Sequence, residues 1–286
     1  MEPKRALRVG GVNYLNSQPL VHRFADLATE RGLNARLVRD LPSRLADSLM
    51  TGRLDAALAP AFEALRSPSH RPISDACVAA DGPVSSVKVY FRRPPADVRT
   101  LALDEGSRTS VALGRLLLIR RHGVRPNDVP LPIGDGLVDS TADAVLVIGD
   151  RAMTPPPAAV ARSFVAEWDL AEEWRRDTGL PFVFAVWTAP RGVDCRDLVE
   201  LLQACRDDGA GRLGEIAASH GPPLGLSVEH AHRYLRDRLR FRLGPREARG
   251  LAEFRRACRD EGLLPTPATA LPSPGHATPP AATPAR

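Results

Sequence analysis

Side chains able to bind an anion or move a proton gather in four short segments, each beside a predicted strand. The first is loop 13–20, which follows the apolar segment Leu7–Val12. Ligands of open α/β sheets collect at the carboxyl ends of strands, so this loop is a candidate binding site. Asn16 offers a hydrogen-bond donor and an acceptor, and Ser17 offers a hydroxyl. Asn16 would equally serve to cap the turn, and the sequence leaves both interpretations open.

The second segment lies where a predicted strand gives way to a helix. It contains three hydroxyls and one guanidinium, from Ser107, Arg108, Thr109 and Ser110. Free N–H groups and the helix dipole attract anions at such a helix start, and short hydroxyls add donors. Together the four residues predict a carboxylate or phosphate site. The alternative is an ordinary N-cap by Ser107 or Thr109, with Arg108 as a surface cation.

The third segment, residues 82–87, turns at a Gly-Pro pair and places Ser85 and Ser86 at the start of a predicted strand. Neighbouring residues on a strand point to opposite faces, so only one of the two serines could face a cleft. No histidine or acid nearby completes a triad, and no G-x-S-x-G motif occurs. A hydrogen-bonding serine is therefore favoured over a nucleophile.

The fourth segment follows a predicted buried strand at residues 143–148 and consists of Gly149 and Asp150. An aspartate at a strand end could orient Arg108 or bind substrate. It could equally cap the turn before Arg151, and the sequence slightly favours this second interpretation.

Motifs for metals and nucleotides are absent from the sequence. No H-E-x-x-H and no G-x-x-x-x-G-K-[ST] occurs, and His230 and His232 are spaced too closely to share a helix face. The four cysteines stand singly, which favours reduced thiols over disulfides or metal ligands. We therefore expect neither a cofactor nor a metal.

Charge and hydropathy limit the partners of this protein. The 39 basic and 34 acidic residues give a net charge of +5, and aromatic residues make up only 5% of the chain. A diffuse charge with few aromatic residues argues against a nucleic-acid partner. The N-terminus lacks the apolar core of a signal peptide, and no apolar run approaches the roughly 20 residues of a membrane span. We expect a cytoplasmic protein that acts on an anionic small molecule without a membrane partner; the sequence does not indicate the oligomeric state.

The predicted elements alternate between strands and helices. Strands are expected at residues 7–12 and 55–59, with a helix from Pro42 to Gly52 between them, which is typical of a parallel sheet covered by helices. Further strands are expected at residues 84–91, 101–104, 143–148 and 182–187, and further helices after residue 108, around 170–176, and after Asp194, Ser227 and Gly244. Residues 265–286 contain seven prolines and predict a disordered tail.

Read in order, these segments resemble the chorismate dehydratases of menaquinone biosynthesis by the futalosine route. Residues 14–20 (YLNSQPL) are similar to the family's YLN[ST]xPL, and residues 102–111 (ALDEGSRTSV) to its ALDxxSRTSVxL. Residues 84–87 resemble its GxVxSV strand, and residues 143–150 (DAVLVIGD) its ADAxLxIGD. Residues 169–187 resemble DLGxEWxxxTGLPFVFAxW, with Ala171 where glycine is common. The similarity runs from about residue 8 to residue 265.

The resemblance implies a two-lobed α/β fold of the periplasmic-binding-protein type II, with the ligand cleft between the lobes. Lobe 1 would contain residues 1–93 and 187–264, and lobe 2 residues 94–186, with the chain crossing near residues 92–95 and 184–190. The implied catalytic residues are Asn16, Ser86 and Asp150. The implied substrate-binding residues are Tyr14, Ser17, Ser85, Ser107, Arg108, Thr109, Ser110 and Gly149.

The implied reaction is a hydro-lyase step that converts chorismate to 3-[(1-carboxyvinyl)oxy]benzoate and water. The proton beside the enolpyruvyl ether is vinylogous to the ring carboxylate, and its loss with the neighbouring hydroxyl makes the ring aromatic. Such a reaction needs orientation more than a strong nucleophile. The base could be a carboxylate of the substrate or Asp150. The alternatives are a cytosolic solute-binding or sensor protein of the same fold without turnover, and a prephenate-dehydratase-like lyase.

Overall fold

The computed structural model describes residues 5–265 and contains two β-sheets. The first sheet has six strands in the spatial order β11-β4-β10-β3-β1-β2, namely β1 (Leu7–Val12), β2 (Ala35–Asp40), β3 (Ala56–Pro60), β4 (His70–Ala80), β10 (Phe182–Pro190) and β11 (Arg240–Arg242). The second sheet has five strands in the order β7-β6-β8-β5-β9, namely β5 (Val87–Phe91), β6 (Thr100–Asp104), β7 (Asn127–Leu131), β8 (Ala144–Ile148) and β9 (Ala166–Asp169).

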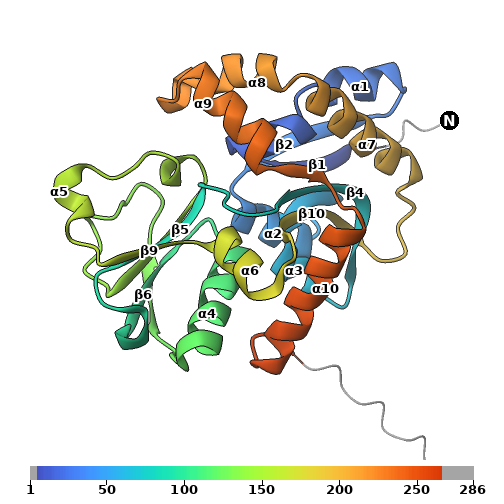
Figure 1. Ribbon diagram of the computed structural model, residues 1–286. Helices are drawn as coiled ribbons and strands as arrows, with labels where there is room; N and C mark the ends of the chain where they lie inside the picture. The colour runs from blue at the N-terminus through green and yellow to red at the C-terminus, as the bar shows by residue number, and fades with distance from the viewer. Residues whose placement is uncertain (1–4, 266–286) are drawn as a thin grey trace, which may run out of the picture.

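Helices surround both sheets. They are α1 (Phe24–Glu30), α2 (Pro42–Met50), α3 (Ala61–Arg66), α4 (Thr109–His122), α5 (Ala158–Ala161), α6 (Leu170–Thr178), α7 (Arg196–Gly211), α8 (Leu213–His220), α9 (Val228–Arg233) and α10 (Pro245–Asp260). Figure 1 shows two lobes: α4, α5 and α6 accompany the second sheet, and α1 and α7 to α10 accompany the first. Among residues 5–265, no helix has the length and apolar character needed to span a membrane.

Short helical turns complete the chain. The 3₁₀ turns are η1 (Leu15–Leu20), η2 (Pro95–Asp97), η3 (Asp150–Ala152) and η4 (Pro222–Leu224), and η5 (Tyr234–Arg238) is a π turn. The expected disorder of residues 265–286 concerns a segment outside the described residues, except for Pro265.

The strongest local signals predicted their elements correctly. Leu7–Val12 is a strand, and it pairs in parallel with β2 and β3 as the β-α-β order predicts. Ser227 caps α9 by accepting from the His230 N–H, and Pro245 occupies the first turn of α10. The predicted strand at residues 84–91 begins later, at Val87.

The two crossings between the sheets lie earlier in the chain than predicted. Strand β4 belongs to the first sheet and β5 to the second, so the first crossing falls within residues 81–86 rather than near 92–95. The second falls within residues 170–181, between β9 and β10, rather than near 184–190. The predicted boundaries at 93/94 and 186/187 are therefore wrong: β5 lies in lobe 2 and β10 in lobe 1. Both strands are largely buried, and hydrophobicity does not tell which sheet a buried strand joins.

Helix α7 packs directly against η1. A Cβ atom at Gly209 would lie 1.9 Å from the Pro19 carbonyl oxygen, so only glycine lets the helix approach this closely. The side chains of Leu15 and Leu20 are buried in the same apolar cluster as those of Leu201 and Leu202. The turn that carries the first polar segment is thus held from behind by a helix nearly 200 residues further along the chain.

Candidate active site

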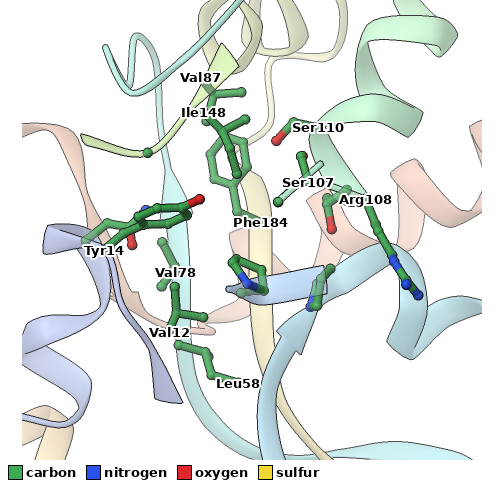
Figure 2. A pocket seen from close by; sticks show the side chains of 17 residues that line it. Val12, Tyr14, Leu58, Val78, Val87, Ser107, Arg108, Ser110, Ile148 and Phe184 are labelled. Carbon is green, nitrogen blue, oxygen red and sulfur yellow. The ribbon is translucent and has the colours of Figure 1, made fainter. Parts of the chain in front are cut away.

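A narrow cavity lies between the two sheets (Figure 2). Its empty space, including the open mouth, is about 500 Å³, but a water molecule's centre can reach only about 60 Å³ of it. Much of the wall is apolar and consists of Val12, Pro42, Leu58, Pro60, Val78, Val87, Ile148, Phe184 and Ala185. A cavity that is mostly apolar with a few convergent polar groups is typical of small-molecule sites.

Seven of the eleven predicted site residues line this cavity. They are Tyr14, Asn16, Ser107, Arg108, Thr109, Ser110 and Gly149. Figure 2 shows Tyr14 on one side of the cavity, and Ser107 and Ser110 at the start of α4 on the other. Ser17, Ser85, Ser86 and Asp150 do not line it, and their contacts assign them to its supports.

Tyr14 lies directly on Gly149. This glycine has a φ of 72°, and a Cβ atom there would be 2.8 Å from the Tyr14 ring, so both the backbone and the close approach require glycine. Burial, with a smaller effect from Asp104, raises the pKa of Tyr14 above its ordinary value. The phenol therefore stays protonated and can donate a hydrogen bond into the cavity.

The Ser17 hydroxyl braces the loop from inside. It donates to the Val12 carbonyl at 2.6 Å and contacts the Tyr14 carbonyl at 2.9 Å, and the residue is fully buried. Because the Ser17 hydroxyl is hydrogen-bonded to the backbone, it is not free to bind substrate as the sequence predicted.

Ser85 and Ser86 precede the strand rather than begin it, so the expectation that they point to opposite faces of a strand does not apply. Ser85 has a φ of 67°, and its N–H donates to Asp169 Oδ2 at 2.6 Å. Ser86 is buried, and its carbonyl accepts from the Gly149 N–H at 2.9 Å. The pair forms the crossing between the lobes at the edge of the cavity.

Tyr234 was not predicted as a site residue. Its hydroxyl is buried and donates to Ser86 Oγ at 2.8 Å. The sequence offers no local signal for this role, because Tyr234 stands among the apolar residues of a C-terminal helix, where a core position is expected.

The start of α4 differs from an ordinary capped helix. Arg108 occupies the N-cap position without a side-chain capping bond, so the alternative of Ser107 or Thr109 as the cap is wrong. The hydroxyls of Ser107 and Ser110 reach the cavity, and neither bonds another residue within the described part of the chain. An uncapped helix start with two available hydroxyls fits the predicted anion site.

Arg108 and Thr109 reach across to the first lobe. The Arg108 guanidinium lies 2.6 Å from Asp47 Oδ1 and 3.4 Å from Glu63 Oε1, and Figure 2 shows its side chain extending away from the centre of the cavity. Thr109 Oγ1 accepts from the Phe62 N–H at 3.1 Å. These two predicted ligand contacts thus connect the lobes beside the cavity.

Asp104 connects the turn after β6 to the end of β8 beneath the cavity, and it was not predicted from the sequence. This buried carboxylate accepts from the Gly106 N–H at 2.9 Å and the Ile148 N–H at 3.0 Å, and it pairs with Arg151. The turn after β6 is thereby fixed to the end of β8. An acid at a strand end was visible in the sequence, but its partner Arg151 lies 47 residues away.

Asp150 holds loop 13–20 from the opposite lobe. Its Oδ1 accepts from the Leu15 N–H at 3.0 Å, and burial raises its pKa to about 6. The hypothesis that Asp150 orients Arg108 is wrong, because Arg108 pairs with Asp47 and Glu63 instead.

The residues that line the cavity include no aspartate, glutamate, histidine or cysteine. Within residues 5–265, no group of three or more such side chains is placed to hold a metal ion. The polar chemistry of the wall is therefore that of amide, hydroxyl and guanidinium groups.

Comparison with known proteins defines first the class and then the family. Solved structures of the periplasmic-binding-protein fold match over most of their length. A Candida albicans protein described as having this generic fold is 13% identical with a TM-score of 0.62, covering 91% of each chain. The periplasmic aliphatic sulphonate binding protein of Escherichia coli is 14% identical with a TM-score of 0.59, covering 92% of this chain and 90% of that one. The expected fold is thus confirmed.

The family follows from the sequence itself. The family model for menaquinone biosynthesis matches residues 7–260, and the chain belongs to this family. The chorismate dehydratase of Thermus thermophilus is 32% identical over 263 residues, which span 87% of this chain and 94% of that relative. The resemblance seen in the motifs is confirmed.

Proposed function

We propose that this protein is a chorismate dehydratase that converts chorismate to 3-[(1-carboxyvinyl)oxy]benzoate and water. The family match and the Thermus thermophilus relative support this function over nearly the whole chain. The observation that carries it is the composition of the cavity: one amide, a phenol and several hydroxyls on an apolar wall between two lobes. Such a site suits an anion that must be oriented rather than attacked.

The elimination needs few protein groups. The C–H bond beside the enolpyruvyl ether breaks, its electron pair forms the new ring double bond, and the neighbouring hydroxyl takes up a proton and leaves as water. In our proposal, the Ser107 and Ser110 hydroxyls at the start of α4 bind a substrate carboxylate. Asn16 and Tyr14 bind the hydroxyl and ether oxygens attached to the ring, from the other lobe. Donors fixed before the substrate arrives lower the barrier without rearranging during the reaction.

The proton acceptor in this proposal is a carboxylate of the substrate. The cavity wall supplies no carboxylate or imidazole of its own. Asp150, the competing base, does not line the cavity, and one of its oxygens is occupied by the Leu15 N–H. If this assignment is correct, Asp150→Asn retains turnover within about tenfold of wild type, whereas a loss of several orders of magnitude would assign the base to Asp150.

The test is incubation of the purified protein with chorismate, followed by proton NMR. We expect aromatic product signals with the vinyl protons of the enolpyruvyl ether retained. Binding of chorismate without product would support the alternative of a solute-binding or sensor protein, and turnover of prephenate but not chorismate would support the prephenate-dehydratase-like alternative. A cytoplasmic location stays a prediction.

A further inference from the structure

A second cavity lies within the first lobe and shares no lining residue with the cavity between the sheets. A water molecule's centre can reach about 580 Å³ of it, against about 60 Å³ of the other. Helix α3 runs from one cavity to the other: Pro60, just before this helix, lines the first, and Ala64 to Arg66 at its end line the second. The second cavity is large enough for a small organic molecule.

The wall of this second cavity combines apolar and basic groups. Its apolar part consists of Ala64, Leu65, Pro68, Pro72, Leu243, Ala248, Leu251, Ala252 and Pro265. Its basic part consists of Arg66, His70, Arg191, Arg255 and Arg259. None of the described residues that line it is an aspartate or a glutamate. Such a wall favours a ligand that has both an apolar body and a negative charge.

Two of the four arginines already have partners. Arg66 donates to Glu63 Oε2 at 2.6 Å, so its charge is compensated by a buried carboxylate. Arg191 Nε donates to the Pro68 carbonyl at 2.9 Å and connects the end of β10 to the loop after α3. The two arginines of α10 therefore supply most of the charge available to a ligand.

Arg255 and Arg259 lie four residues apart on α10, on the face that also carries Ala248, Leu251 and Ala252. Within residues 5–265 neither guanidinium pairs with an acid, and Arg259 Nε is buried without a hydrogen-bond partner. Like charges at this spacing destabilise a helix, and a buried unpaired donor costs free energy. An anion bound between the two side chains would relieve both effects.

We propose that the second cavity is a binding site for a small organic anion, a molecule with an apolar body and a carboxylate or phosphate group. The anionic group lies against Arg255 and Arg259, and the apolar body extends along α10 toward Leu251 and Leu243. The site is separate from the cavity proposed for chorismate. Its occupancy can be measured without turnover, so the proposal does not depend on the proposed function.

The test is a fluorescence titration with 8-anilinonaphthalene-1-sulfonate, a dye that carries an anionic group on an aromatic body. We expect saturable binding, with a Kd about tenfold or more higher when Arg255→Gln and Arg259→Gln are combined, because two charge-assisted contacts are lost. Arg256→Gln is the matched control, since Arg256 lies on the same helix but donates to Glu253 and Asp260. It should leave the Kd of the dye unchanged.

The proposal would be overturned if the wild type showed no saturable binding, or if the double variant bound the dye as tightly as the wild type. A second variant keeps both arginines. Ala252→Glu places an acid at an exposed position of α10, three residues before Arg255, where it would neutralise that guanidinium and repel an anion. The Kd should again rise about tenfold, and an unchanged Kd would contradict the proposal.

Competition for the dye identifies the anionic group. Octanoate and octyl phosphate carry a carboxylate and a phosphate on the same apolar chain, and octanol carries no charge. We expect one or both anions to displace the dye at concentrations where octanol does not. Equal displacement by octanol, or no displacement by either anion, would overturn the proposal.

Two further measurements separate this ligand from other occupants. Pro265 lines the cavity, so the titration is repeated on a variant that ends at this residue. Dye binding by this variant but not by the full chain would mean that residues 266–286 occupy the cavity. Sedimentation with phosphatidylglycerol vesicles, without binding of the free dye, would assign the arginines to a membrane surface. Either result would overturn the proposal.

Discussion

Asn16 lies on η1 and lines the cavity. The sequence left two interpretations of Asn16 open, a contact with the ligand and a cap of the turn. The bracing of the loop is done by the Ser17 hydroxyl and by Asp150, and no bond of the Asn16 side chain to the loop backbone is found among residues 5–265. This favours a contact with substrate.

Asn16→Asp keeps the size of the side chain but adds a negative charge and removes the amide donor. In a site for a dianionic substrate we expect kcat to fall about 100-fold or more, with little change in melting temperature. Asn13→Asp is the matched control, because it makes the same change at an exposed position of the same loop. If Asn16 only braced the loop, stability would fall first and kcat per folded molecule would stay near normal.

At the residue scale, the sequence identified the polar residues of the cavity wall, because they stand at strand ends. Asn16 and the residues that follow β6 could be found this way. Ser17 and Asp150 were found by the same signal, yet their side chains turn to backbone groups, and this choice depends on tertiary geometry. Tyr234 and the Asp104–Arg151 pair could not be found, because their roles depend on partners far along the chain.

At the scale of elements, the turn η1 is held by contacts from three directions. Helix α7 approaches it through Gly209, the Ser17 hydroxyl ties it to β1, and the Asp150 carboxylate from the second lobe accepts its first N–H. The strand β1 and the helix starts after Ser227 and Gly244 were predictable from local patterns. The edge strand β2 was not, because none of its residues is fully buried.

The contact between Asp150 and η1 predicts that the stability of the protein depends on pH. The folded-state pKa of about 6 lies above the ordinary value of 3.8, so the folded protein binds this proton more tightly than the unfolded chain does. The contribution of Asp150 to stability is therefore greatest below pH 4 and is lost as the pH rises to 6. Asp150→Asn keeps the acceptor for the Leu15 N–H and cannot ionise.

We expect Asp150→Asn and wild type to be about equally stable near pH 4. At pH 7 the variant should be more stable by about 1–3 kcal/mol, the free-energy equivalent of the pKa shift with an allowance for partial solvent access. Urea unfolding at both pH values measures this difference. A difference in unfolding free energy that does not change with pH would show that Asp150 is not a buried acid.

At the scale of the whole molecule, side chains from both lobes meet around the cavity. Arg108 pairs with Asp47, Thr109 accepts from Phe62, and Asp150 accepts from Leu15, each across the gap between the sheets. The cavity enclosed by these contacts is narrow. The motifs predicted two lobes, but the crossings were misplaced because the strands that flank them are hydrophobic in either sheet.

Such an arrangement predicts that the lobes separate to admit substrate and close over it. Small-angle scattering should give a smaller radius of gyration with saturating 3-[(1-carboxyvinyl)oxy]benzoate than without it. Arg108→Gln weakens the contact with Asp47 and should increase the radius of the ligand-free protein. Identical scattering curves with and without ligand would mean that the cavity does not open by movement of the lobes.

The central claim is that chorismate is dehydrated in the cavity between the lobes, with Asn16 against the reacting ring. A crystal structure of the Asn16→Ala variant soaked with chorismate, beside the wild type soaked with product, tests it most directly. We predict ligand density between Tyr14 and the start of α4, where Ser107 and Ser110 lie, with the ether oxygen of the product within hydrogen-bond reach of Asn16 in the wild type. Ligand bound elsewhere on the molecule, with this cavity empty, would contradict the account.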